Sequence, residues 1–219
     1  MQRIYLQLFF LILMLCFGTA CQDELLKTCS QDMLDERDGQ TYCTVTIGTQ
    51  LWMAENLRFV SDSSYLNPSN PSTVNQEYGR LYTFSQALNV CPEGWHLPSD
   101  DEWKQLESFA GVNAHELDLS TQRGNTAGAQ LKATEGWASS NDSNAIATDL
   151  LGFKALAAGE WNPSFGPYFN LGTEASFWTS TAYDSTGGAW MRRLSHSSGS
   201  IERNYFSQSL GFSCRCIKN

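Results

Sequence analysis

The sequence predicts an α+β domain in which two helices come early and short antiparallel strands come late. Apolar residues recur at helical spacing over residues 83–90 and 99–110. From about residue 150 onward, short apolar runs are separated by Gly, Asn, Pro and Ser. Alternating apolar positions near both ends of the folded region indicate that the N- and C-terminal strands pair in one sheet.

The composition excludes several classes of protein. The chain has 219 residues, of which 42% are hydrophobic and 12% aromatic, so one domain with a packed core is expected rather than a disordered chain. It contains 14 Lys and Arg against 23 Asp and Glu, a net charge of −9. Because phosphate binding requires a basic face, nucleic acid is not expected as a partner.

Residues 1–20 have the pattern of a signal peptide. Arg3 is their one charge, and the apolar run 8–17 is shorter than the roughly 20 residues of a membrane-spanning helix. Small residues then precede Cys21, which resembles the lipobox of bacterial lipoproteins, although Gly18 replaces the usual Leu. The resemblance implies a lipid on Cys21 that anchors the chain to a membrane. The alternative is an ordinary secretory signal, cut before an unmodified Cys21.

The segment after Cys21 is acidic. Gln22-Asp23-Glu24 resembles the surface-export signal of Bacteroidota lipoproteins, which implies an outer-membrane location with the domain facing the cell exterior. The alternative is a solvated acidic linker. Residues 21–36 show no apolar periodicity, so they are predicted to form an acidic tether, and the folded domain is expected over residues 37–219.

The first strands follow a turn at Asp38-Gly39, because such a pair adopts the positive φ of a tight turn easily. Alternation over residues 41–47 predicts a strand that carries Cys43, and the apolar run 51–57 predicts the next one. Residues 60–77, rich in Ser, Asn and Pro, are expected to be a surface loop.

The second helix has the clearer boundaries. Ser99 and Glu102 form a capping box, and Gly111 is the expected end of the helix. The acidic residues of its first turn are explained by the helix dipole rather than by acid–base chemistry. Late strands are predicted over 177–181, 189–194, 205–206 and 210–217.

The cysteines predict disulfides in an exported chain. Cys16 leaves with the signal and Cys21 is the lipid site, which leaves five cysteines: Cys29, Cys43, Cys91, Cys214 and Cys216. If the first and last strands are neighbours, Cys43 meets Cys214 and Cys216 is free to reach Cys91, so Cys29 stays unpaired. A zinc site at Cys214 and Cys216 is not expected, because the chain has no partner motif for it.

Several ordered segments together resemble one family, the Fibrobacter succinogenes major paralogous domain of Bacteroidota and Fibrobacterota lipoproteins. The segments are 38–42, 45–57, 78–83, 91–103, 152–156, 177–181 and 211–216. The resemblance covers about residues 37–219 and implies a C-type-lectin-like fold, in which the terminal strands pair. It also implies a disulfide between Cys91 and Cys216. It implies no defined molecular function.

Neither chemistry of the fold's better-known relatives is expected. Formylglycine-generating enzymes need a redox-active Cys pair, whereas residues 187–210 contain no cysteine. Calcium-dependent lectins need Glu-Pro-Asn or Gln-Pro-Asp together with Trp-Asn-Asp, and none of these triplets occurs. We therefore expect no enzyme, no metal and no cofactor.

What remains is a binding surface. Residues 160–170 hold four aromatic side chains among Gly, Pro and Asn, a composition that suits a ligand-binding loop. The candidate ligand-binding residues are Trp161, Tyr168, Trp178, Trp190 and Arg192. The alternative is that Trp161 and Phe169 fill a small core of the loop itself. The predicted function is a surface-exposed, non-catalytic binding or adhesion module for glycan or protein; the alternative is a structural envelope lipoprotein without a ligand.

Overall fold

The computed structural model describes residues 29, 31–62, 64–65, 78–164, 166–184 and 187–219. The predicted signal peptide, Cys21 and the acidic segment that follows it lie outside these residues. No helix among the described residues has the length and apolar character to cross a membrane.

The predicted α+β class with two helices is wrong, because the protein is built mostly from strands. In the described part of the chain, only α4 (Asp100–Phe109) is longer than a single helical turn. The other expected helix shrinks to α3 (Phe84–Ala87). Leu88 is its C-cap, and the next N–H, that of Asn89, bonds to the carbonyl oxygen of Gln86 three residues back, so the helical turn tightens and ends before residue 90. A short 3₁₀ turn, η1, covers Ser143–Ala145.

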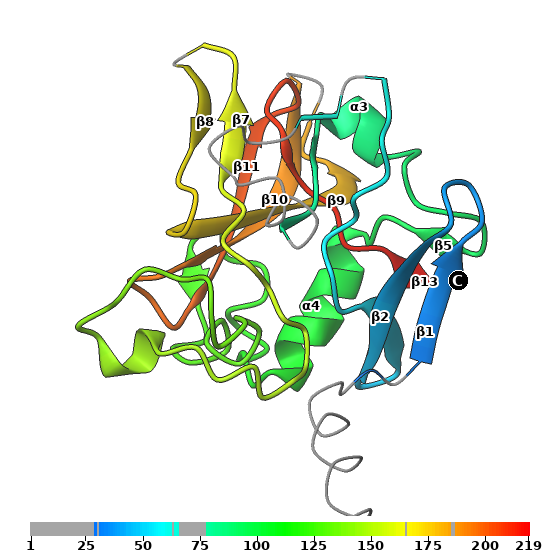
Figure 1. The fold of residues 1–219 in the computed structure, drawn as a ribbon. Helices are drawn as coiled ribbons and strands as arrows, with labels where there is room; N and C mark the ends of the chain where they lie inside the picture. The colour runs from blue at the N-terminus through cyan, green and yellow to red at the C-terminus, as the bar shows by residue number, and fades with distance from the viewer. Residues whose placement is uncertain (1–28, 30, 63, 66–77, 165, 185–186) are drawn as a thin grey trace, which may run out of the picture.

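The first sheet contains both the early strands and the last one (Figure 1). Its order is β1-β2-β3-β13-β5, with the bounds Gln31–Asp35, Gln40–Ile47, Gln50–Met53, Ile217–Lys218 and Trp95–His96. β1 occupies residues that were predicted to be tether, so the tether prediction is wrong for this part. Ile217 pairs with Trp52 of β3. The last strand therefore shares a sheet with β2 but is not its neighbour.

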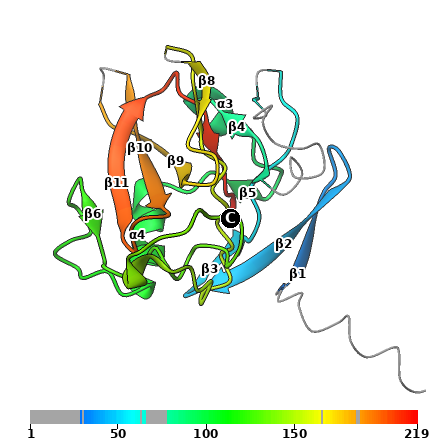
Figure 2. The same ribbon diagram turned by 60° about the vertical axis from the view of Figure 1, so that its left-hand side comes forward.

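The second sheet has the order β4-β12-β9-β10-β11-β6. Its strands span Leu81–Tyr82, Phe212–Ser213, Glu174–Ala182, Gly188–Ser195, Ile201–Ser207 and Gln122–Arg123. A separate hairpin joins β7 (Glu160–Asn162) to β8 (Gly166–Phe169). The strands of the two large sheets lie on different sides of the molecule, with β10 and β11 on one side and β1 and β2 on the other (Figure 2).

Two cores lie against the two faces of the second sheet. Successive side chains of a strand point to opposite faces, so Phe177 and Trp178 of β9 enter different cores. Phe177 packs with Trp103 of α4, which in turn lies 5.1 Å from Trp52 of the first sheet, ring centre to ring centre. Trp178 packs edge-on against Phe84 and also contacts Phe212.

The disulfides correct one predicted pairing and match the other. Cys91 is bonded to Cys216, as predicted. Cys43 is bonded to Cys29, so the predicted Cys43–Cys214 bridge is wrong. The reason is that β3 lies between the strand of Cys43 and the C-terminal strand. Cys214 is a free, fully buried thiol in the core around Trp178.

A buried lysine joins three segments of the loop-rich half. The Lys132 ammonium donates to the carbonyl oxygens of Ala145 (2.6 Å), Ser195 (2.9 Å) and Ser198 (3.0 Å), which matches its three N–H groups. Its side chain is almost completely buried. The ammonium therefore acts as an internal cross-link between η1 and the turn that follows β10.

Replacing this lysine should destabilise the fold. Lys132→Met keeps the apolar stem but removes the ammonium donor from three carbonyl oxygens, of which only that of Ser195 has another donor among the hydrogen bonds described, the Ser198 N–H, so we expect the free energy of unfolding to fall by about 2–4 kcal/mol. Urea unfolding followed by tryptophan fluorescence measures this change. Lys218→Met, at an exposed lysine, is the matched control and should change the value by less than about 0.5 kcal/mol. Equal stability of the two variants would contradict the cross-link.

Candidate functional site

Trp178 does not lie at a surface. Its side chain is 0% exposed, and its indole Nε1 donates to the carbonyl oxygen of Tyr82 at 2.8 Å. β9 is an inner strand of the six-stranded sheet, and both of its faces are covered. The structure thus places this predicted ligand-binding residue in the core.

Arg192 is also buried, where it belongs to an ion network between α4 and the second sheet. Its guanidinium pairs with Asp100 at 2.8 Å and with Glu107. Glu107 also accepts a hydrogen bond from Arg123, and Arg123 in turn donates to the backbone oxygens of Leu117 and Leu119. Since Arg192 is fully enclosed by these contacts, it is not available for a ligand as predicted.

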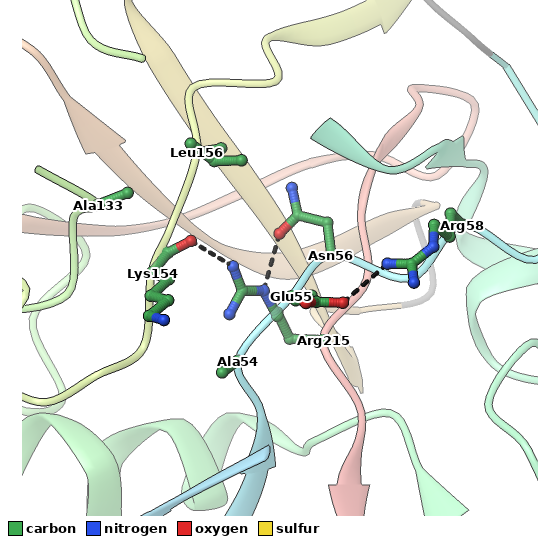
Figure 3. A pocket seen from close by; sticks show the side chains of 8 residues that line it. All are labelled: Ala54, Glu55, Asn56, Arg58, Ala133, Lys154, Leu156 and Arg215. Atoms are coloured by element: carbon green, nitrogen blue, oxygen red, sulfur yellow. Dashed lines mark hydrogen bonds and ion pairs between the residues drawn. The ribbon is translucent and has the colours of Figure 1, made fainter. Parts of the chain in front are cut away.

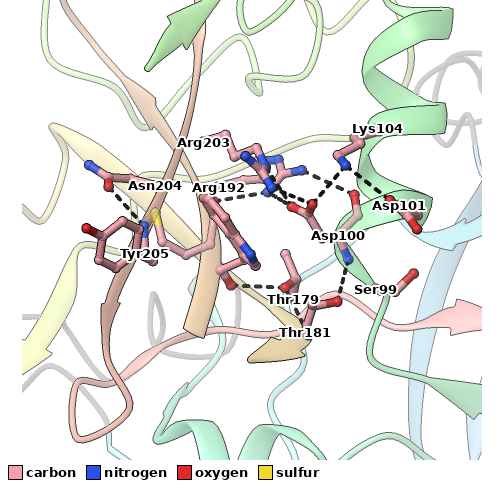
Figure 4. A network of polar contacts seen from close by, with 12 residues as sticks. Ser99, Asp100, Asp101, Lys104, Thr179, Thr181, Arg192, Arg203, Asn204 and Tyr205 are labelled. Carbon is pink, nitrogen blue, oxygen red and sulfur yellow. Dashed lines mark hydrogen bonds and ion pairs between the residues drawn. The ribbon is translucent and has the colours of Figure 1, made fainter. Parts of the chain in front are cut away.

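Asp100 is the centre of the network (Figure 4). Its two oxygens accept hydrogen bonds from Nε and Nη2 of Arg203 at 2.9 and 2.8 Å, and Nζ of Lys104 lies 3.2 Å from Oδ2. Burial alone would raise the pKa of Asp100, but the hydrogen bonds from Arg203 and the charge of Arg192 outweigh burial and lower it. The carboxylate is therefore held charged at the N-terminus of α4, where the helix dipole also favours it.

The predicted aromatic loop is the β7–β8 hairpin. Trp161 stacks on Tyr65, with ring centres 3.8 Å apart and planes 8° from parallel, and its backbone pairs with Gly211. Tyr168 faces Trp161 across the hairpin. Both predicted residues are half-buried, so the stacking of Trp161 matches the alternative in which these rings hold the loop in place.

Trp190 lies in a group of three aromatic rings at the surface, which we call the aromatic platform. Its members are Tyr183, Trp190 and Tyr205. The two tyrosine rings stack with centres 3.6 Å apart and planes 1° from parallel. Trp190 meets them edge-on, at 5.1 Å from Tyr183 and 5.7 Å from Tyr205. Tyr183 is 39% and Tyr205 42% exposed, so the pair presents ring surface to solvent.

The ion network holds the platform from behind. The guanidinium of Arg203 lies 3.4 Å from the centre of the Trp190 ring and is the same group that binds both oxygens of Asp100. In addition, the pairing of β9 with β10 shifts between Ala189 and Met191, at the position of Trp190. Such irregularities often re-aim a side chain. Trp190 is therefore held in place by contacts within the domain.

Sequence reasoning found Trp190 but missed Tyr183 and Tyr205. The available signal was alternation in two neighbouring strands, since Trp190 and Arg192 face Tyr205 and Arg203 in register. Placing Tyr205 opposite Trp190 requires the length of the turn between β10 and β11, which the local sequence pattern does not determine. Among the residues that the structure describes, no group of three or more His, Cys, Asp or Glu side chains is placed to hold a metal ion.

Over the residues that the structure describes, these observations define a class of protein: a β-rich domain with two disulfides, a ten-residue helix packed on the second sheet and a surface aromatic platform. A model of the Fibrobacter succinogenes major domain matches residues 45–218, and the chain belongs to this family. Comparisons with curated proteins and with solved structures give no match.

Removing the charge of Asp100 should destabilise the protein in a pH-dependent way. Asp100→Asn leaves two buried guanidinium groups short of a counter-charge, so the free energy of unfolding at pH 7 should fall by about 3–5 kcal/mol. The folded-state pKa of Asp100 lies below its unfolded value of about 3.9. Its stabilisation is therefore full above about pH 4 and is lost as the pH falls toward the folded-state pKa.

The measurement is urea unfolding of the wild type and Asp100→Asn between pH 2 and 7. The gap between their unfolding free energies should narrow below about pH 4. Asp101→Asn is the matched control, because its side chain is 86% exposed on the same helical turn. A gap that is the same at pH 3 and pH 7 would show that the charge of Asp100 is not what holds the network.

Proposed function

We propose that the chain is a non-catalytic binding module for a glycan, displayed at the cell surface by a lipid on Cys21. The observation that carries the proposal is the aromatic platform. Contiguous exposed apolar surface often marks an interaction site, and tyrosines offer a large contact area at a small loss of conformational entropy.

The geometry of the platform suits a sugar. The apolar C–H face of a pyranose ring packs on an aromatic ring, while sugar hydroxyls find partners in tyrosine O–H groups, which both donate and accept hydrogen bonds. The rings are already ordered by their mutual stacking and by Arg203 behind Trp190. Little side-chain freedom is then lost on binding, which favours affinity.

The remaining features support display rather than catalysis. Residues 1–20 and the Cys21 that follows have the signal and lipidation pattern, and two disulfides suit an oxidising, extracytoplasmic environment. The net charge of −9 disfavours nucleic acid as the partner. In this proposal, the chain contacts the membrane through the lipid on Cys21.

The second candidate is a structural envelope lipoprotein without a specific ligand. It is favoured by the packing roles of Trp161, Trp178 and Arg192, which all serve the fold. The two candidates differ in one respect, because only the binding module needs Tyr183 and Tyr205 to be exposed.

Truncating the tyrosines tests the binding function. On an array of bacterial and host glycans the wild type should bind a defined subset, and Tyr183→Ala or Tyr205→Ala should weaken that binding by about tenfold or more, since a lost aromatic contact contributes roughly 1–2 kcal/mol. Tyr205→Phe keeps the stacked ring and should bind within a few-fold of the wild type. Phe109→Ala, at an aromatic ring that is 58% exposed on α4, is the control for nonspecific stickiness. A wild type that binds no glycan would favour the structural candidate.

Lipidation gives an independent test of display. Metabolic labelling with an alkyne fatty acid should mark the wild-type chain, whereas Cys21→Ser should remain unlabelled and leave the membrane fraction. Protease added to intact cells should degrade the domain if it faces outward. An unlabelled wild type would indicate an ordinary secreted protein instead.

A further inference from the structure

A cavity of about 370 Å³ lies where the segment after β3, the segment after Gly152 and the C-terminal segment meet (Figure 3). It shares no residue with the aromatic platform. Its polar lining comes from Glu55, Asn56, Arg58, Lys154 and Arg215. Three of these five side chains are cationic, and the volume is in the range of cavities that hold small ligands.

Arg215 is a buried cation without a carboxylate partner within the described residues. Its side chain is 1% exposed, and it donates to Asn56 Oδ1 (2.7 Å) and to the backbone oxygens of Met53 (3.2 Å), Phe153 and Lys154 (2.8 Å). These four hydrogen bonds leave one of the five guanidinium N–H groups without an acceptor. Since Arg215 lines the cavity, a ligand there could meet the remaining N–H.

The charge of Arg215 is only partly compensated. Burial lowers the pKa of Arg215 to about 9, and the more distant charges of Glu55 and Asp149 offset this only in part. Asn56, which is also buried, accepts from Arg215 and donates to the carbonyl oxygen of Tyr78 at 2.9 Å. This arrangement fixes the guanidinium in position, whereas an anion would complete its charge balance.

Lys154 is held at the cavity by an unusual backbone. Its φ of 53° lies in the left-handed region, which a side chain other than Asn, Asp or Gly rarely adopts. The conformation is fixed from both sides, because the Lys154 N–H donates to Asp149 Oδ1 at 2.8 Å and its carbonyl oxygen accepts from Arg215. The ammonium itself forms no ion pair with any other described residue. Local strain of this kind is common at ligand sites.

The other charges around the cavity are already matched or lie to one side. Arg58 pairs with Glu55 at 2.8 Å, so these two cancel. Asp149 and Glu135 line a neighbouring depression that shares Ala133, Lys154 and Leu156 with the cavity, and Asp149 offsets part of the charge of Arg215 without forming an ion pair with it. The groups available to an incoming ligand are therefore Lys154 and Arg215, both positive, beside the apolar surfaces of Ala54 and Leu156.

We propose that this cavity binds the carboxylate of a small acidic ligand, with the Lys154 ammonium and the remaining Arg215 N–H as its anion-binding groups and Asn56 as the residue that positions Arg215. Charge-assisted hydrogen bonds from a guanidinium and an ammonium are the strong contacts that a carboxylate makes. Two sources share this chemistry, the acid group of an acidic sugar and that of a small organic acid.

Isothermal titration calorimetry on the full chain, with glucuronate, succinate and glucose as probes, tests the site. Glucuronate should bind and glucose, its neutral analogue, should bind at least tenfold more weakly. Equal binding of succinate would show that the acid group alone is recognised, whereas binding of glucuronate alone would identify an acidic sugar; either result supports the site. Absence of binding by both acids would overturn it.

Variants separate the cavity from nonspecific charge and from the platform. Lys154→Gln should weaken acid binding by tenfold or more, while Lys218→Gln, which removes the same charge at an exposed position, should not change it. Leu156→Trp, which fills the cavity without changing charge, should also abolish binding. Tyr205→Ala should leave acid binding intact, so a failure here is distinguishable from a failure at the platform. Equal affinities of Lys154→Gln and Lys218→Gln would refute the assignment.

Discussion

The buried ion network between α4 and the second sheet is the constraint on which the rest of the molecule depends. Asp100 and Glu107 lie seven residues apart on one face of α4, and three buried arginines, Arg123, Arg192 and Arg203, meet them. A buried charge without its partner is strongly destabilising, so α4 can pack on the sheet in only one position. That position sets Trp103 among Trp52, Phe153 and Phe177, and it places Arg203 behind Trp190. The packing of the core and the position of the aromatic platform therefore both depend on this ion network.

The C-terminal segment provides a second junction. Within three consecutive residues, Arg215 reaches the cavity, Cys216 is bonded to Cys91, and Ile217 pairs with both Trp52 and His96. The disulfide closes a separation of 125 residues, which in the chain-entropy view stabilises the fold by about 4–5 kcal/mol. Because these three consecutive residues carry all three contacts, the geometry of the cavity is tied to the closure of the first sheet.

Features encoded by neighbouring residues could be predicted from the sequence, and features decided by distant ones could not. The capping box of Ser99 and Glu102 lies within one turn, and the structure contains it. The strands predicted over 41–47, 177–181 and 189–194 lie within β2, β9 and β10, whereas the strand predicted over 210–217 is divided into β12 and β13. The fold class failed because the expected early helix is one turn long, and Cys43 was given the wrong partner because strand order is a long-range property. Arg192 was predicted to bind a ligand, but in the structure it is covered by carboxylates of α4. One of them, Glu107, lies 85 positions earlier in the chain.

The buried cations among the described residues are compensated in different ways, and the comparison shows why Arg215 is the one assigned to the proposed anion site. Arg192 and Arg203 are matched by carboxylates. Lys132 has no carboxylate, but its three N–H groups meet three carbonyl oxygens, so its donors are all used. Arg215 forms no ion pair with a described carboxylate, its charge is only partly offset by Glu55 and Asp149, one of its N–H groups has no acceptor, and it lines a cavity. Arg123 Nε also has no acceptor, but Arg123 is paired with Glu107, whereas Arg215 lines the cavity in which we propose that an anion completes its contacts.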